Sequence, residues 1–205
     1  MMGLHRFFGA FLGLFIIVHL GVHVIAFWGP DAHANALGAV QGIYRNRFIE
    51  PLLIAAIIAQ AIIGGRFAWR RLREPSKKFW QWAQILSGAY LAFFLIIHAG
   101  AALMTRHIFN LDTNFYWPAG TLNVNPFYFG FMPYYFLGVV AFFTHVAAAI
   151  HFSTGKIMVP RLIIGMGAAI ALFIIAIFSG VFFEIVLPPE YAAYFTNYRK
   201  LFGGG

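Results

Sequence analysis

The sequence contains no cysteine and has few charged residues. Without cysteine, the chain cannot itself form a disulfide, ligate an iron–sulfur cluster, bind haem through a thiolate or build a cysteine zinc site. Charged residues make up 10% of the chain and hydrophobic residues 61%, whereas a soluble domain has about a quarter charged and roughly half apolar residues. A globule of 205 residues cannot bury that much apolar surface, so lipid must be the solvent for much of it.

Acidic residues are especially scarce, with six Asp and Glu against 14 Lys and Arg. The resulting net charge of +8 would suit a nucleic-acid-binding protein. The basic residues, however, lie in short loops between apolar runs, which is the pattern that orients membrane proteins. We therefore predict no nucleic-acid partner. The apolar N-terminal run has no separate basic region and no clear cleavage site, so we expect a retained helix rather than a removed signal.

Five apolar runs approach the length of about 20 residues that is needed to cross the hydrocarbon core. We predict an all-α integral membrane protein, a single membrane domain over residues 1–205, with transmembrane helices at about 7–28, 51–69, 82–104, 133–152 and 160–187. A four-helix alternative would bury the second run as a core helix, and the length of that run argues against it. The remaining stretches are an aromatic outer segment, 105–132, and an outer C-terminal tail, 188–205.

The basic residues are divided unequally between the two ends of the predicted bundle. Nine lie at the end that carries the N-terminus and five at the other, with the densest cluster between Arg66 and Lys78. Because cytoplasmic loops carry the excess of Lys and Arg, this division predicts a cytoplasmic N-terminus.

Two interpretations of the aromatic outer segment, residues 105–132, remain open. Aromatic side chains gather at membrane interfaces, where their amphipathic rings sit at the level of the headgroups. Loops of this length are also often functional, and the segment could dock other membrane subunits.

Histidines are the main ionisable residues inside the predicted spans. Such residues are costly in lipid and face the interior of the bundle, and neutral imidazole is a good ligand for iron. A lone histidine of this kind is most simply a core residue bonded to a neighbouring helix. We expect His33 and His107, which lie outside the spans, to be solvated loop residues. The histidines inside the spans are His19, His23, His98, His145 and His151.

Depth in the membrane pairs His19 with His98. The two residues lie 12 positions past Phe7 and 16 past Trp82, on predicted helices that run in the same direction. A rise of about 1.5 Å per residue puts them at similar depths of about 18 and 24 Å. Two imidazoles at one depth could bind a single iron axially, so we predict a haem-binding helix bundle with these two ligands. His23 lies one turn beyond His19 on the same face and is the reserve ligand.

His145 lacks a partner of this kind. It lies in the inner half of the membrane, and its depth on the second helix is occupied by Gln60 or Ala61. His145 could ligate a second haem, remain a core residue, pair with His151 or Gln60, or reach a quinone. One haem is therefore the expectation, and two haems the alternative.

A quinone site needs a proton donor and a hydrogen-bonding group beside an apolar slot at the membrane surface. Snorkelling and interfacial anchoring explain the same residue types without a quinone. The candidates at the cytoplasmic end are His5, Arg6, Trp80, Trp82, Gln84 and Ser87.

Three sequence patterns accompany these histidines. The first is Leu4-His5-Arg6 with Gly9, followed by a run from Gly13 to His19-Leu20; the second is a Q-x3-G-x9-H pattern; the third is G-x6-H. With these patterns in this order, the chain resembles the haem-bearing membrane anchor of succinate dehydrogenase and fumarate reductase, in its single-polypeptide, five-helix form. The resemblance covers the first, third and fourth helices and the overall topology. The last two patterns are formed by Gln84, Gly88 and His98, and by Gly138 and His145.

Anchors of this family hold two b haems through histidines on helices 1 and 3 and on helices 2 and 4. They pass electrons between peripheral iron–sulfur and flavoprotein subunits on the cytoplasmic face and membrane quinone. The resemblance thus implies a cytochrome b of the respiratory chain in the bacterial inner membrane, as a non-catalytic or quinone-reactive subunit of an oxidoreductase. The sequence departs from the family at helix 2, because neither Gln60 nor Ala61 is an ordinary haem ligand.

The sequence bears differently on two other classes of function. A structural subunit of a larger respiratory or photosynthetic complex could retain the anchor fold without turnover, and the missing histidine on helix 2 favours it. A transporter is disfavoured, because Glu184 is the single carboxylate within the predicted spans and broken helices at the midplane are not evident.

Overall fold

Five helices are long and apolar enough to cross a membrane in this computed structural model, which describes residues 1–76 and 78–201. The prediction of an all-helical, multi-pass membrane protein with five candidate spans is confirmed. The spans are α1 (Met2–Ile25, continued by the 3-10 helix η1, Ala26–Trp28), α3 (Ile49–Leu72), α4 (Phe79–His107), α6 (Phe127–Thr154) and α7 (Met158–Phe178).

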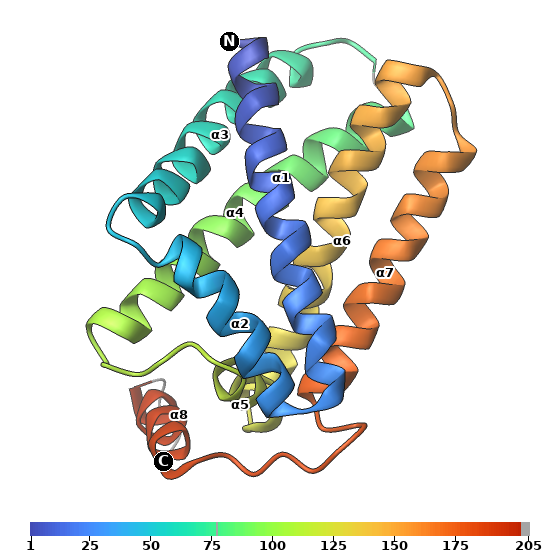
Figure 1. The fold of residues 1–205 in the computed structure, drawn as a ribbon. Helices are drawn as coiled ribbons and strands as arrows, with labels where there is room; N and C mark the ends of the chain where they lie inside the picture. The colour runs from blue at the N-terminus through green and yellow to red at the C-terminus, as the bar shows by residue number, and fades with distance from the viewer. Residues whose placement is uncertain (77, 202–205) are drawn as a thin grey trace.

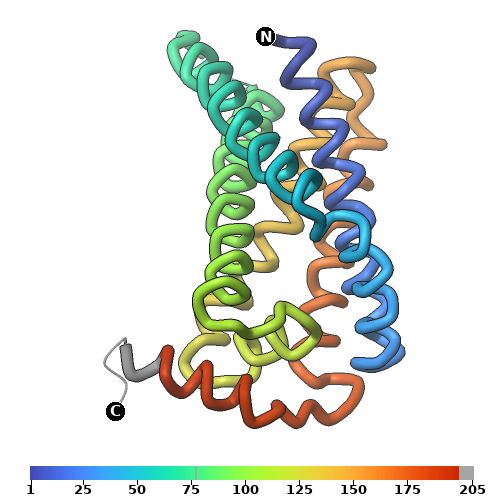
Figure 2. The backbone as a smooth tube through the Cα atoms, turned by 60° about the vertical axis from the view of Figure 1, so that its left-hand side comes forward, coloured from blue at the N-terminus to red at the C-terminus, as the bar shows by residue number. Residues whose placement is uncertain are grey.

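Three shorter helices gather at one end of the bundle (Figure 1). They are α2 (Pro30–Tyr44), α5 (Tyr116–Asn123) and α8 (Pro189–Leu201), and we call their end the capped end. The chain begins at the opposite end, called here the N-terminal end, where α3 leads into α4 and α6 into α7. Figure 2 shows α8 lying across the capped end, at a steep angle to the long helices.

Two of the predicted helix bounds differ clearly from the structure. The last span ends at Phe178 rather than at 187, because Gly180 adopts a positive φ of 77° that a continuing right-handed helix does not allow. The fourth span begins at Phe127 rather than at 133, so that Pro133 lies inside α6. The aromatic outer segment thus contributes the first turns of a membrane helix.

Both stretches predicted as outer segments contain helices. Gly29, with φ of 104°, reverses the chain after η1, and Pro30 then occupies the first turn of α2, where its missing N–H is not needed. In the aromatic outer segment, Phe115 and Trp117 are buried against the bundle. Part of this segment is therefore core, and is not free to act as an interfacial belt or a docking surface.

The bundle consists of one tightly packed group of helices and one looser group. Helix α6 has its most extensive contacts with α7 and α4, whereas α1 contacts α2 and α3 and makes no close backbone contact with α4 among the described residues. Many large apolar side chains point outward, including Leu14, Leu86 and Leu172, each 60% or more exposed. Such a surface is suited to lipid.

Candidate functional site

Four histidines from three helices meet in the half of the bundle nearer the capped end. His19 and His23 come from α1, His33 from α2 and His98 from α4. The Nε2 atoms of His19 and His23 lie 3.1 Å apart, and Nδ1 of His23 lies 3.3 Å from Nε2 of His33. The ring centroids of His19 and His98 are 6.1 Å apart. We call this group the four-histidine cluster.

The expectation that His33 is a solvated loop residue is wrong. Its side chain is 1% exposed, and its ring stacks on that of His23. Burial, with a smaller contribution from nearby His19, lowers the pKa of His33 to about 4, so the ring is neutral at pH 7. Leu37, four residues further on, is also buried; this i, i+4 spacing in the sequence was the available signal of an inward helix face. His107 is exposed, as expected.

Aromatic rings hold two of these imidazoles in place. Phe15 stacks on His19 with centroids 5.8 Å apart, and Phe94 stacks on His98 at 5.3 Å with an interplanar angle of 9°. Phe94 in turn occupies the space left by Gly138 of α6, where an added Cβ would collide with its ring. The glycine of the G-x6-H pattern therefore supports the histidine of α4.

A cavity of about 210 Å³ adjoins the cluster. His19, His23 and His98 line it together with mostly apolar side chains from α1, α3, α4, α6 and α7. The α1 and α4 backbones stay apart, and the rings of His19 and His98 lie edge to face in this region, with an interplanar angle of 68°. The site is an apolar hollow with an imidazole from each of two helices.

The donor set fits an axially ligated haem. Imidazole nitrogens bind a metal at about 2 Å, so two rings on opposite sides of one metal have centroids about 6 Å apart. No group of three or more His, Cys, Asp or Glu side chains suited to a bare metal ion occurs among residues 1–76 and 78–201. A porphyrin brings four nitrogens of its own and needs two from the protein. Nε2 of His19 points toward His23, so either His19 or His23 could supply the iron ligand from α1.

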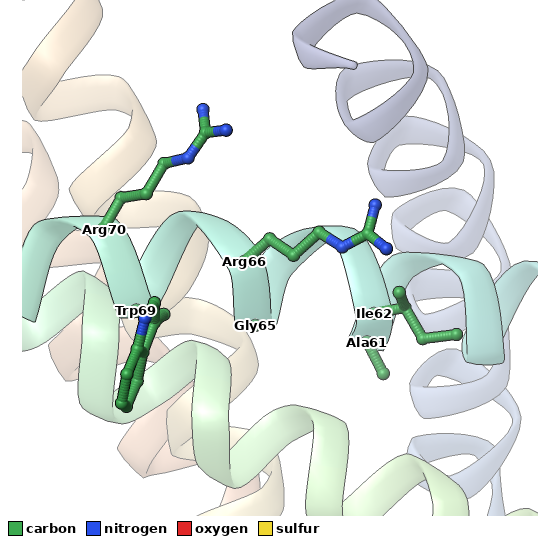
Figure 3. Close-up of a pocket in the computed structure, with 6 residues that line it drawn as sticks. All are labelled: Ala61, Ile62, Gly65, Arg66, Trp69 and Arg70. Atoms are coloured by element: carbon green, nitrogen blue, oxygen red, sulfur yellow. The ribbon is translucent and has the colours of Figure 1, made fainter.

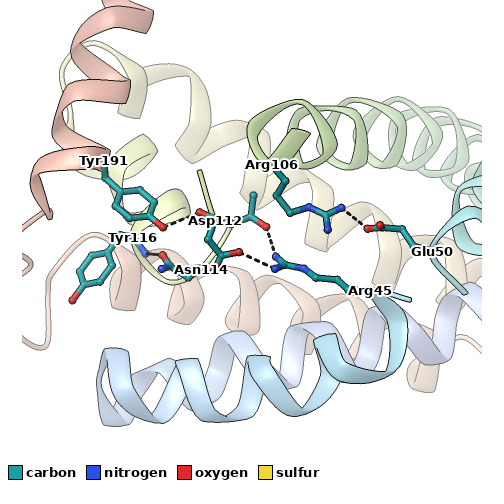
Figure 4. A network of polar contacts seen from close by, with 8 residues as sticks. Arg45, Glu50, Arg106, Asp112, Asn114, Tyr116 and Tyr191 are labelled. Atoms are coloured by element: carbon teal, nitrogen blue, oxygen red, sulfur yellow. Dashed lines mark hydrogen bonds and ion pairs between the residues drawn. The ribbon is translucent and has the colours of Figure 1, made fainter. Parts of the chain in front are cut away.

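Charged side chains stand at the edge of the cavity toward the capped end (Figure 4). Arg106 pairs with Glu50, and both line the cavity. Arg45 donates to Oδ1 of Asp112 at 2.8 Å and to Oγ1 of Thr113 at 2.7 Å. The guanidinium groups could hold carboxylates such as the propionates of a haem.

The same network ties α8 to the loop before α5. The hydroxyl of Tyr191 donates to the backbone oxygen of Asp112 at 2.8 Å. Burial, followed by the charges of Asp112 and Glu190, raises the pKa of Tyr191, so the hydroxyl keeps the proton that it donates. Figure 4 shows this contact beside the Arg45 ion pair.

A second group of polar side chains lies toward the N-terminal end. His145 of α6 is 3.3 Å from the hydroxyl of Ser87, and an added Cβ on Gly88 would come within 2.9 Å of its ring. His5 is close enough to His145 to interact with it electrostatically. Nδ1 of His5 and Oε1 of Gln60 are buried without a hydrogen-bond partner in the described structure. We call His5, Gln60, Ser87 and His145 the N-terminal cluster.

The other quinone candidates do not all join this cluster. Trp80 is buried and stacks on His151 at 4.7 Å, and His151 is bonded through Nδ1 to the backbone oxygen of Lys156. The structure therefore does not show the pairing of His151 with His145 that the sequence left open. Arg6 is exposed. Gln84 accepts a hydrogen bond from Arg71.

Sequence reasoning missed the approach of His5 to His145. His5 and His19 are 14 residues apart, close to four helical turns, so both lie near one face of α1. Once His19 was assigned an inward position, His5 could have been assigned one as well. Gln60 and Ala61 are the two α3 residues expected at the depth of His145. Of these, Gln60 lies against Gly9 of α1.

Function has to be inferred from these side chains and their geometry. Comparison of the chain with protein-family models, with curated proteins and with solved structures found no match.

Proposed function

We propose that this protein is a cytochrome b membrane anchor that passes electrons between a peripheral iron–sulfur or flavoprotein subunit and membrane quinone, as in succinate:quinone oxidoreductases. The observation that carries the proposal is the pair of imidazoles, His19 and His98, whose rings are 6.1 Å apart beside an apolar cavity. Histidines at this depth on two different helices are costly in a membrane unless they serve a site.

Each part of the site has a role in this proposal. His19 and His98 would hold the iron of a haem b, and His23 would take the place of His19 if its ring is the one that turns toward the cavity. Phe15 and Phe94 fix the ring planes. The apolar lining excludes water, which helps to set the redox potential. The haem, when bound, supplies one-electron redox chemistry.

The N-terminal cluster is the proposed quinone site. A quinone carbonyl accepts hydrogen bonds, and the imidazole of His5 and the hydroxyl of Ser87 are groups that can donate them. The cluster lies in the half of the bundle away from the four-histidine cluster, on the side of the exposed basic residues. The alternative use of His145 is ligation of a second haem, for which His5 is the nearest other imidazole of the cluster.

A peripheral subunit is proposed to dock at the N-terminal end, which the positive-inside rule places in the cytoplasm. A clustered positive surface accelerates association with an acidic partner and makes it sensitive to salt. Lys77, part of the predicted basic loop, lies outside the described residues. The exposed basic side chains at this end include Arg6, Arg73, Lys78, Lys156 and Arg161.

This docking proposal can be tested by charge reversal at Arg73 and Lys156, with purification through a tag on the full chain. The peripheral partner should be lost from the variant at low salt, while the unmodified chain loses it only as salt is raised. Retention of the partner by the variant at all salt concentrations would exclude this surface as the electrostatic docking site.

A structural subunit of a larger respiratory or photosynthetic complex is the second candidate function. The observation in its favour is that α3 contributes Gln60, not a histidine, to the N-terminal cluster. Docking of other membrane subunits would then use the exposed part of the aromatic outer segment, where Ile108 and Phe129 are each about 70% exposed.

An absorption spectrum and a pyridine haemochrome assay on the purified chain separate these functions. The proposal expects one haem b per chain. Two haems per chain would show that the N-terminal cluster also ligates iron. Absence of haem from protein prepared with an adequate haem supply would reject the cytochrome and leave the structural subunit.

A further inference from the structure

The last turns of α3 carry a shallow hollow on the outside of the bundle, unrelated to the two histidine sites. Its volume is about 380 Å³. Figure 3 shows Arg66 and Arg70 extending from the same side of the helix, with the ring of Trp69 below them. The lining residues are Ala61, Ile62, Gly65, Arg66, Trp69 and Arg70.

The two arginines of this hollow are unpaired within the described part of the chain. Arg66 and Arg70 are four residues apart, one helical turn, and neither has a hydrogen-bond or ion-pair partner among residues 1–76 and 78–201. The neighbouring arginines differ: Arg71 donates to Gln84, and the guanidinium of Arg73 lies over the ring of Trp69. Like charges one turn apart repel each other, so an anion between them would be favourable.

The floor of the hollow is apolar, and at Gly65 no described side chain covers the helix backbone. An added Cβ on Gly65 would meet no described atom within 4 Å, so the helix backbone is open there. Ile62 lies one turn from Arg66 toward the membrane interior, and both Ile62 and Trp69 are more than half exposed. The charged part of the hollow is thus at the end of a predicted span, and its apolar part faces the lipid.

We propose that this hollow binds one anionic phospholipid. The guanidinium groups of Arg66 and Arg70 hold the phosphate, for which the planar donor fork of arginine is well suited. An acyl chain lies against Gly65, Ala61 and Ile62, and Trp69 packs at the level of the glycerol backbone, where tryptophan is favoured. Snorkelling would explain either arginine alone, but not the open backbone at Gly65 beside them.

The test measures binding of phosphatidylglycerol to the full chain in detergent by native mass spectrometry. Arg66→Gln with Arg70→Gln should weaken binding at least tenfold relative to the unmodified chain. The control is Lys156→Gln with Arg161→Gln, which removes the same charge from the same end and should leave binding within twofold. Phosphatidylcholine should bind the unmodified chain at least tenfold more weakly.

Three further arms test the site and the chemistry of its ligand. Gly65→Leu fills the floor but keeps both arginines, and should weaken binding of the long-chain lipid several-fold. Inorganic phosphate at millimolar concentration should not displace the lipid. Arg66→Lys with Arg70→Lys preserves the charge and should lose less affinity than the glutamine pair, which separates loss of the site from loss of folding.

Several outcomes would overturn the proposal. These are equal loss of lipid in the glutamine pair and its control, unchanged binding in Gly65→Leu, or displacement by inorganic phosphate, which would indicate a site for a free anion. Loss of a soluble partner from the glutamine pair with lipid binding intact would assign the hollow to protein docking instead.

Discussion

In the half of the bundle nearer the capped end, four histidines form a chain of neighbouring rings beside a cavity; toward the N-terminal end, His145 lies against a serine and a glycine. In the first region, the ring nitrogens of His23 lie 3.1 Å from a ring nitrogen of His19 and 3.3 Å from one of His33. In the second, His145 faces Ser87 at 3.3 Å, and the nearby Gln60 carries a buried oxygen without a partner.

The comparison shows that residue type alone does not define a site in a membrane bundle. His98 and His145 both come from long apolar helices, yet only His98 faces an imidazole of α1 across a cavity. The N-terminal cluster offers hydroxyl, amide and imidazole groups, which suit hydrogen bonding to a small polar headgroup. Substitutions in the two clusters can distinguish histidines that ligate haem iron from those that form hydrogen bonds.

If the proposed haem is bound, the largest effect is expected from His98→Ala, which should abolish it because the substitution removes one of the two proposed ligands. His145→Ala should leave the haem in place, since His145 lies in the other cluster. The pyridine haemochrome assay on both purified variants measures this. Equal loss of haem in the two variants would show that the pairing of His19 with His98 is wrong.

His33→Ala should lower the free energy of unfolding by about 2–3 kcal/mol, because it removes a fully buried ring and leaves Nδ1 of half-buried His23 without its partner. His107→Ala changes an exposed histidine at the same end and should shift stability by less than about 0.5 kcal/mol. Thermal unfolding of the detergent-solubilised variants provides the comparison. Similar melting temperatures for the two would contradict the burial of His33.

Gly138→Ala should destabilise the protein by about 1–2 kcal/mol, because the new methyl group displaces Phe94 from the ring of His98. Gly130→Ala is the matched control in the same helix, where an added Cβ meets no described atom within 4 Å. The control should be neutral or slightly stabilising. A haem absorption band that shifts in Gly138→Ala and stays unchanged in Gly130→Ala would link Phe94 to the orientation of His98.

Gly88→Ala is the corresponding change in the N-terminal cluster, with a smaller expected cost of about 1 kcal/mol. The added Cβ approaches the edge of the His145 ring at 2.9 Å, and a ring can turn more easily than a packed phenylalanine can move. Haem content should not change, while inhibition by a quinone analogue should weaken. Loss of haem in this variant would place iron in the N-terminal cluster.

Five long apolar runs and the inward histidines could be read directly from the sequence, because length and hydropathy are local properties. The spacing of His33 and Leu37 indicates an inward helix face, but the burial of His33 also required α2 to fold back against the bundle after Gly29, and a local pattern does not specify that packing. The early end of α7 at Phe178 depended on the backbone at Gly180, in a stretch whose apolar composition is equally compatible with helix. The partner of His145 was sought on the second span, whereas the neighbouring imidazole comes from the first.

Helices α4 and α6 each have a glycine that makes room for a ring of the other helix, and this reciprocal packing has a mechanical consequence. Gly88 of α4 receives His145 of α6, and Gly138 of α6 receives Phe94 of α4. Sliding one helix past the other by a single turn, about 5.4 Å, would displace both side chains from the space beside these glycines at once. Helices α4 and α6 should therefore move as one body. Among the described residues α1 makes no close backbone contact with either of them, so a group bonded to both His19 and His98 would join α1 directly to this rigid pair.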